Sequence, residues 1–165
     1  MTAGAPAPPT VALPRPGLGR LRDRVAMVVG AGQTPGDTMG NGRATAIVFA
    51  REGARVVVVD RDLARAQDTA AGIEADGGTA IALEVDITHE ADCRRLVEAT
   101  LDAHGRIDIL HNNVGIGGDD AGPTRLEEAV WDRIMTVNVK GLFLTCKHVL
   151  PVMRRQAGGT IINIS

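Results

Sequence analysis

Short runs of β-branched residues alternate with longer helical stretches from about residue 24 onward, and this alternation limits the possible folds more than any other feature. Five runs predict strands, over residues 25–29, 55–59, 79–85, 107–111 and 160–164. Four intervening stretches predict helices, over residues 42–52, 63–75, 90–104 and 125–155. Strands joined through single helices form right-handed crossovers and therefore a parallel sheet, and the nearly all-apolar first two strands suit a sheet covered on both faces. The sequence thus predicts an α/β fold, a doubly wound parallel sheet of about five strands.

The last and longest predicted helix carries two further local signals. Thr124 and Glu127 have the spacing of a capping box, which predicts that the helix begins there. Pro151 lies near the other end, where the missing N–H of proline predicts a kink.

The length of 165 residues is that of one domain. Residues 1–22 are rich in proline and alanine and are expected to form a disordered extension, and residues 23–165 are expected to form the folded domain. The net charge of −2 indicates no basic surface, and no apolar run reaches the length of a membrane span, so we expect neither nucleic acid nor membrane as a partner. Cys93 and Cys146 lie outside any CxxC or metal-ligand spacing, which favours reduced thiols in a cytoplasmic protein without a metal site.

A glycine-rich segment, GAGQTPGDTMGNG, joins the first predicted strand to the first predicted helix. Ligands of open parallel sheets bind at this position, because the free amides and partial positive charge of the helix N-terminus attract a pyrophosphate. Gly36, Gly40 and Gly42 form a GxxxGxG spacing. We expect Gly30 to make the turn out of the strand and Gly40 and Gly42 to face the phosphates. Gly32 and Gly36 are expected only to let an inserted loop turn.

Asp60 ends the second predicted strand, about twenty residues beyond the last glycines of this loop. A carboxylate at this position accepts hydrogen bonds from adenosine ribose hydroxyls and repels a 2′-phosphate, which favours NAD over NADP. Arg61 and Arg65 weaken this preference, because an arginine there would pair with the phosphate. The alternative role for Asp60 is the N-cap of the helix that begins at Leu63.

Five ordered segments resemble the short-chain dehydrogenase/reductase family. The glycine segment is similar to the TGxxxGxG loop of the family, with Val29 in place of threonine and with an insertion. The segments VDI, NNVG, WDRIMTVNVKG and GGTIINIS are similar to four later landmarks, so the resemblance runs from about residue 21 to residue 165. It implies a Rossmann fold and an NAD(P)-dependent oxidoreductase that moves a hydride between the nicotinamide and an alcohol or carbonyl substrate. It also implies that the full-length form is a homo-oligomer.

The same resemblance assigns roles to residues beyond the glycine loop. Asp86 and Ile87 correspond to the adenine contact of the family, Asn113 and Gly115 to its cofactor-binding NNAG motif, and Asn138 to its catalytic asparagine, which disturbs its helix and holds a water in a proton relay. Local alternatives remain for two of them: Asp86 would cap the helix after Thr88, and Asn138 would bond a nearby carbonyl within its helix.

A second asparagine in the NNVG motif has two possible roles. Asn112 either contacts the cofactor or satisfies backbone groups where the strands separate, and the sequence favours neither.

The chain contains no tyrosine. In the family, a serine, a tyrosine and a lysine in a Tyr-x-x-x-Lys helix act on the substrate, and by the resemblance these would all lie after Ser165. The expectation is therefore a cofactor-binding N-terminal portion, truncated before the last strands and inactive by itself.

Two other classes of function also fit the glycine turn and the acidic residue. One is an S-adenosylmethionine-dependent methyltransferase, which has a similar first turn. The NNVG motif and the WDRIMTVNVKG segment argue against it. The other is a non-catalytic nucleotide-binding module.

Overall fold

The computed structural model describes residues 17–33, 36, 38–117 and 121–164. Most of the expected N-terminal extension therefore lies outside the described residues. Its last part is attached to the domain: the Leu21 amide donates to the Glu52 carbonyl at 2.8 Å, and the Arg20 guanidinium lies 2.7 Å from the Glu52 carboxylate.

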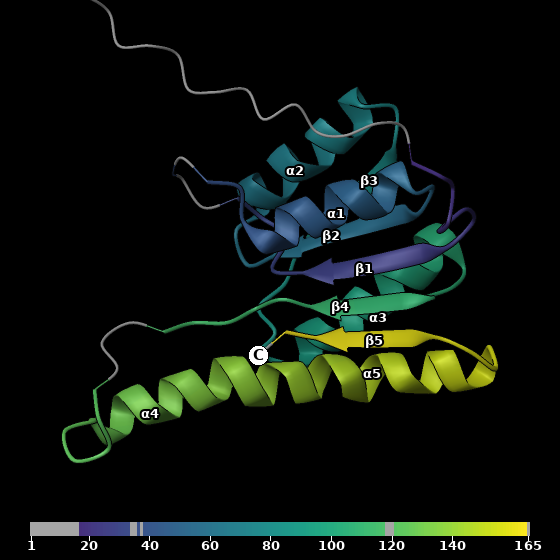
Figure 1. Ribbon diagram of the computed structural model, residues 1–165. Helices are drawn as coiled ribbons and strands as arrows, with labels where there is room; N and C mark the ends of the chain where they lie inside the picture. Colours follow the sequence, from purple (N-terminus) through teal and green to yellow (C-terminus); the bar gives the residue numbers. More distant parts are fainter. Residues whose placement is uncertain (1–16, 34–35, 37, 118–120, 165) are drawn as a thin grey trace, which may run out of the picture.

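The sheet has five parallel strands in the order β3-β2-β1-β4-β5 (Figure 1). The strands are β1 Val25–Val29, β2 Arg55–Asp60, β3 Thr79–Glu84, β4 Ile109–Asn112 and β5 Thr160–Asn163. The chain runs outward from β1 to β3 and then crosses back to β4 on the other side of β1. The doubly wound prediction is confirmed, and the reversal of strand order places a topological switch point between β1 and β4, where such sheets bind ligands.

Helices cover both faces of the sheet, so the strands are buried on both sides. The helices are α1 Asn41–Arg51, α2 Leu63–Ala75, α3 Glu90–His104, α4 Glu128–Met135, the π-helix η1 Thr136–Gly141 and α5 Leu142–Arg155. The side chains of α1 and α2 pack in one apolar cluster with alternate strand residues, and those of α3 and α5 pack in the other.

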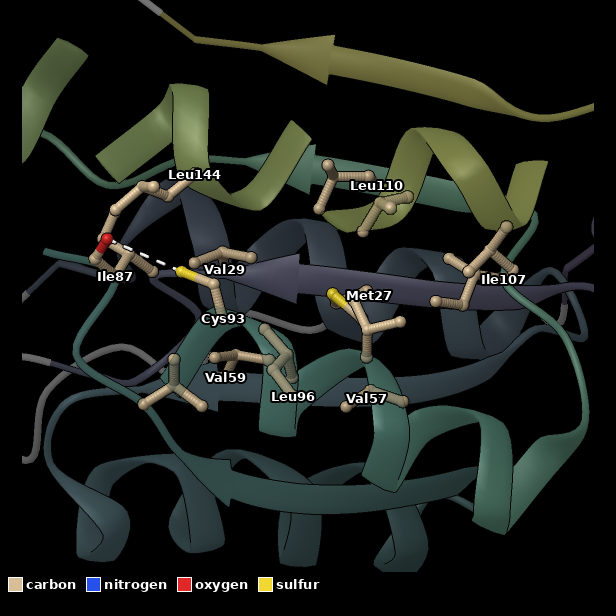
Figure 2. Packing of buried hydrophobic residues seen from close by; sticks show 14 of the residues in the cluster. Met27, Val29, Val57, Val59, Ile87, Cys93, Leu96, Ile107, Leu110 and Leu144 are labelled. Carbon is tan, nitrogen blue, oxygen red and sulfur yellow. Dashed lines mark hydrogen bonds between the residues drawn. The ribbon is translucent and has the colours of Figure 1, made fainter. Parts of the chain in front are cut away.

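The alternation of side chains along β1 explains how each face is filled. Met27 and Val29 point into the α3–α5 cluster, where Figure 2 shows them beside Leu96 and Leu110, whereas Ala26 and Val28 face α1 and α2. The cluster on the α1–α2 face is rich in alanine from both the strands and the helices, which lets α1 and α2 pack close to the sheet.

The long final helix differs from its sequence prediction in three ways. Helix α4 begins at Glu128, and Glu127 occupies its N-cap position without a side-chain cap, so the capping box starting at Thr124 is not formed. A turn replaces it, because the Gly122 carbonyl accepts the amides of Arg125 and Leu126 at 2.8 and 3.1 Å. The π-helix η1 then separates α4 from α5. Helix α5 continues past Pro151 to Arg155 and shows no break there (Figure 1).

Candidate cofactor site

A cavity of about 530 Å³ opens at the carboxyl ends of β1, β2, β3 and β4. Its position is the switch point of the sheet. It is lined by the β1–α1 turn, the end of β2, the segments after β3 and β4, and one residue of η1: Val29, Gly30, Gly32, Gln33, Gly36, Thr38, Gly40, Asn41, Gly42, Asp60, Arg61, Arg65, Val85, Asp86, Ile87, Thr88, Asn113, Val114, Gly115, Ile116 and Val137. All eight expected cofactor-binding residues lie on this cavity.

Gly30 makes the turn at the end of β1, as its position in the sequence predicts. Its φ of 78° lies in the left-handed region that favours glycine. The amides of Gly30 and Ala31 both donate to the Val59 carbonyl, at 2.8 and 3.0 Å, which fixes the turn against β2. A Cβ atom at Gly30 would lie 2.9 Å from Val114 Cγ2, so the turn also needs a small residue.

Gly42, which is expected to face the phosphates, lines the cavity and is buried against this turn. A Cβ atom at Gly42 would lie 1.9 Å from the Gly30 carbonyl oxygen and 2.8 Å from Asn113 Nδ2. Its role in the structure is therefore to let the first turn of α1 approach the end of β1. Gly40 is exposed at the N-cap of α1 and lines the cavity, so it has the open position expected of a residue near a phosphate.

The two asparagines of NNVG have different partners. Asn113 Nδ2 donates to the Gly30 carbonyl at 3.2 Å and thereby braces the turn from the β4 side. Asn112 is buried, and it donates to Asn163 Oδ1 at 3.0 Å while accepting from Thr145 Oγ1 at 2.9 Å. These bonds join β4, β5 and α5, which favours the structural alternative for Asn112.

Gly115, the last residue of NNVG, lies on the open side of the cavity. It is exposed and less constrained than the glycines of the turn, because a Cβ atom there would meet no other atom within 4 Å. The space beside it is therefore free for a ligand.

Asp60 is held by two backbone amides at the end of β2. Its Oδ2 accepts from the Gly32 amide at 3.0 Å, and its Oδ1 accepts from the Asp62 amide at 3.1 Å. The N-cap of α2 is Asp62, whose side chain accepts from the Arg65 amide at 3.3 Å. The capping alternative for Asp60 is therefore wrong.

Gly32 is the residue whose place the sequence did not predict. It lies in contact with Asp60 on the cavity wall, whereas its spacing in the loop indicated only a turn. No local signal could have revealed this contact, because 28 positions separate the two residues.

Asp86 follows β3 and forms a tight turn with Thr88. Its Oδ1 accepts from the Thr88 amide at 2.9 Å and from Thr88 Oγ1 at 2.6 Å. Burial alone would raise the pKa of Asp86, but the bonds from Thr88 and the nearby His89 and Arg61 outweigh it and hold the pKa below its ordinary value. The N-cap of α3 is His89, so the helix-capping alternative for Asp86 is not observed.

Ile87 anchors this segment in the core. It is only 6% exposed, and its carbonyl lies 3.6 Å from the Cys93 thiol, a contact drawn in Figure 2. Burial raises the pKa of Cys93 to about 11, so this thiol is a packing group rather than a nucleophile.

Asn138 lies in the π-helix η1, beside the segment after β4 that lines one end of the cavity. Its Oδ1 accepts from the Ile116 amide at 2.8 Å, and its Nδ2 donates to the Ile116 carbonyl at 2.9 Å. Its side chain thus bonds a loop rather than a carbonyl of its own helix, so the local alternative is wrong. π-Helical turns are rare and occur frequently at functional sites, and this one brings Val137 onto the cavity wall.

Metal sites and membrane spans are both absent from the described part of the chain. Residues 17–33, 36, 38–117 and 121–164 contain no group of three His, Cys, Asp or Glu side chains placed to hold a metal ion. Among the same residues, no helix has the length and apolar character needed to span a bilayer.

The fold and the site define a class, the dinucleotide-binding α/β domains: a glycine turn at the switch point of a doubly wound sheet, with a carboxylate at the end of β2. A sequence model of the short chain dehydrogenase family matches residues 24–165. The chain belongs to this family.

Individual relatives agree with this assignment. The Bacillus subtilis (strain 168) oxidoreductase YxbG is 36% identical over 148 residues, which cover 90% of this chain and 52% of the relative. A crystal structure from Burkholderia xenovorans, described as a short-chain dehydrogenase/reductase, is 46% identical with a TM-score of 0.85 and covers 89% of this chain and 57% of that one. A metagenomic short-chain oxidoreductase solved in complex with NADP is 34% identical with a TM-score of 0.80. The match covers 88% of this chain and 63% of that one. The chain thus spans about half the length of the curated relatives it matches.

Proposed function

We propose that the chain binds NAD and forms the coenzyme-binding part of an oxidoreductase acting on a small alcohol or carbonyl compound. When bound, the coenzyme supplies the hydride acceptor or donor. The observation that carries the proposal is that Gly30, Gly40, Asp60 and Asp86 border one cavity at the switch point. The open N-terminus of α1 would hold the pyrophosphate, and Asp86 with Ile87 would border the adenine.

The preference for NAD rests on Asp60. Its carboxylate borders the cavity and would accept the ribose hydroxyls of NAD, whereas the 2′-phosphate of NADP would meet a like charge. One of the two neighbouring arginines is engaged elsewhere, because Arg65 Nε lies 3.0 Å from Asp62 Oδ2. The relative solved with NADP makes the comparison between coenzymes the decisive measurement.

Isothermal titration of the purified chain is expected to show tighter binding of NAD than of NADP, by roughly tenfold, because one unfavourable charge contact of about 1.4 kcal/mol has that effect. S-adenosylmethionine serves as the third ligand and is expected not to bind. Tighter binding of NADP would mean that Arg61, rather than Asp60, determines the coenzyme preference. Binding of S-adenosylmethionine alone would contradict the oxidoreductase assignment.

Asn138 would contribute through its position rather than through a free side chain. Both polar atoms of its amide are hydrogen-bonded to the Ile116 backbone, so the side chain joins η1 to the loop after β4 at the cavity.

We propose that the proton transfer to or from the substrate needs a tyrosine of the family type, and the chain has none.

The purified chain is therefore expected to bind coenzyme without turnover. A panel of alcohols with NAD, followed by absorbance of the reduced nicotinamide, measures this, with titration on the same preparation as proof that the site is intact. Reproducible turnover by pure, coenzyme-binding chain would mean that another group moves the proton.

An exposed apolar stripe supports self-association of the full-length form. Val139, Phe143 and Leu150 follow helical spacing along η1 and α5 and are 51%, 57% and 38% exposed, and Trp131 on α4 is 53% exposed. Exposed apolar residues at helical spacing are typical of surfaces that pack against another chain, and we propose a second copy.

A further inference from the structure

We propose that Gly32 is a positioning residue for coenzyme specificity, which it sets by holding the Asp60 carboxylate in the orientation that accepts a free ribose 2′-hydroxyl. The inference rests on the proposed function, because it concerns the same coenzyme. The inference extends the proposed function to a residue in the inserted part of the loop, outside the glycines of the GxxxGxG spacing.

Gly32 contacts Asp60 through its backbone amide, and it leaves no room for a side chain beside the Asp60 carboxylate. Its amide donates to Asp60 Oδ2 at 3.0 Å. A Cβ atom at Gly32 would lie 2.5 Å from that same oxygen, 2.7 Å from Asp60 Cγ and 2.8 Å from Arg65 Cβ. Gly32 is not among the glycines with positive φ, so its backbone would accept alanine. The neighbouring side chains, rather than the local conformation, therefore require glycine here.

The surroundings of Asp60 leave it little freedom to adapt. Its second oxygen accepts from the Asp62 amide at 3.1 Å, so each carboxylate oxygen has one backbone donor. Arg65, which forms the other side of the contact, is held by Asp62 through its amide at 3.3 Å and its Nε at 3.0 Å. A methyl group at Gly32 would have to displace either the carboxylate or the loop, and both movements break the bond between Gly32 and Asp60.

The contact has a consequence for specificity because an aligned carboxylate and a merely nearby one act differently. A carboxylate fixed by backbone donors keeps its remaining lone pairs in place to accept hydroxyl hydrogens, and such charge-assisted bonds depend strongly on geometry. A carboxylate rotated away loses those bonds to NAD and also lies less directly against the 2′-phosphate of NADP. Displacement of Asp60 is therefore expected to weaken NAD binding more than NADP binding.

The test is a double-mutant cycle on the full chain, with the ratio of NADP to NAD dissociation constants as the readout. Gly32→Ala is expected to lower this ratio roughly tenfold, the effect of losing one charge-assisted hydrogen bond. Asp60→Asn is expected to lower it at least as much. In the Asp60→Asn background, Gly32→Ala is expected to change the ratio by less than about twofold, because its effect acts through the carboxylate.

Gly159→Ala is the matched control for crowding. Its Cβ atom would lie 2.4 Å from Met153 Cγ and Sδ, remote from the cavity, so it is expected to lower the melting temperature and leave the ratio unchanged. Asp60→Glu is the second variant should Gly32→Ala fail to fold: it keeps the charge, but its extra methylene carries the carboxylate off the Gly32 amide, and the ratio is expected to fall.

The possible failures are distinguishable. Wild-type chain that binds neither coenzyme would overturn the proposed function, and this inference with it. Wild-type chain that prefers NAD, with an unchanged ratio in Gly32→Ala or in Asp60→Glu, would overturn the inference alone. An equal loss of preference in the Asp60 and Asp60→Asn backgrounds would show that Gly32 acts through another group, which also overturns it.

Discussion

Gly42→Ala is expected to lower the free energy of unfolding by about 3 kcal/mol and to remove measurable NAD binding at room temperature. The added methyl would lie 1.9 Å from the Gly30 carbonyl oxygen, and that atom is fixed by the turn at the end of β1. Backbone cannot yield as a flexible side chain does, so α1 must shift away from β1 and carry its N-terminal amides with it. Urea unfolding followed by circular dichroism, together with isothermal titration, measures both effects.

Gly72→Ala on α2 is the matched control for this prediction. A Cβ atom there would lie 3.7 Å from Arg43 Nη2, an ordinary contact distance. Alanine is preferred over glycine within helices by about 1 kcal/mol, so stability is expected to stay the same or rise. Equal losses from the two substitutions would contradict a specific contact between Gly42 and the β1 turn.

The strands and most helices could be predicted because their signals are local. The Val-rich runs of β1 and β2 are too apolar for any exposed position, and α2 and α3 occupy their predicted residues, Leu63–Ala75 and Glu90–His104. The predicted start of α4 was wrong for a physical reason: the Gly122 turn uses Arg125 and Leu126 before the capping box could form. A capping motif predicts a helix start only where no competing turn precedes it.

The glycine loop shows what spacing does not determine. The spacing GxxxGxG placed Gly42 at the helix N-terminus correctly, but its contacts with the Gly30 carbonyl and with Asn113 come from a turn and from a strand far along the chain. Gly32 was missed for the same reason, since its partner Asp60 belongs to another strand. A pattern along the chain identifies residues that need to be small, and only the fold decides what each must make room for.

Asn138 shows the same limit from the side of the helix. Its segment has ordinary helix-compatible residues, and the sequence predicted one helix through it. The π-helical turn is accompanied by two bonds to the Ile116 backbone, 22 positions away. The family resemblance implied a disturbed helix at this residue, and the structure contains one.

Asp108→Ala is expected to lower the free energy of unfolding at pH 7 by about 2 to 3 kcal/mol, because it leaves a buried backbone donor unpaired. Asp108 Oδ2 accepts from the Val25 amide at 2.9 Å, at a fully buried position where β1 begins. Arg106 and Arg24 also donate to the carboxylate, at 2.7 to 3.1 Å. Urea unfolding of wild type and variant measures the difference. NAD affinity of the folded protein is expected to stay unchanged, because Asp108 lies at the opposite ends of the strands from the cavity.

The same substitution makes the acid sensitivity of the fold testable. Burial alone would raise the pKa of Asp108, but its bonds from Arg106, the Val25 amide and Arg24 outweigh burial and lower the pKa below its ordinary value of 3.8. A carboxylate with a lowered folded-state pKa stabilises the protein fully above its unfolded pKa, and this contribution is lost as pH falls through the folded value. The stability gap between wild type and Asp108→Ala is therefore expected to be constant from pH 7 to pH 5 and to shrink below about pH 4. Asp102→Ala, an exposed carboxylate on α3, is expected to change stability by less than about 0.5 kcal/mol at either pH. A gap for Asp108→Ala that stays the same down to pH 3 would mean that the ionised carboxylate contributes nothing beyond its shape.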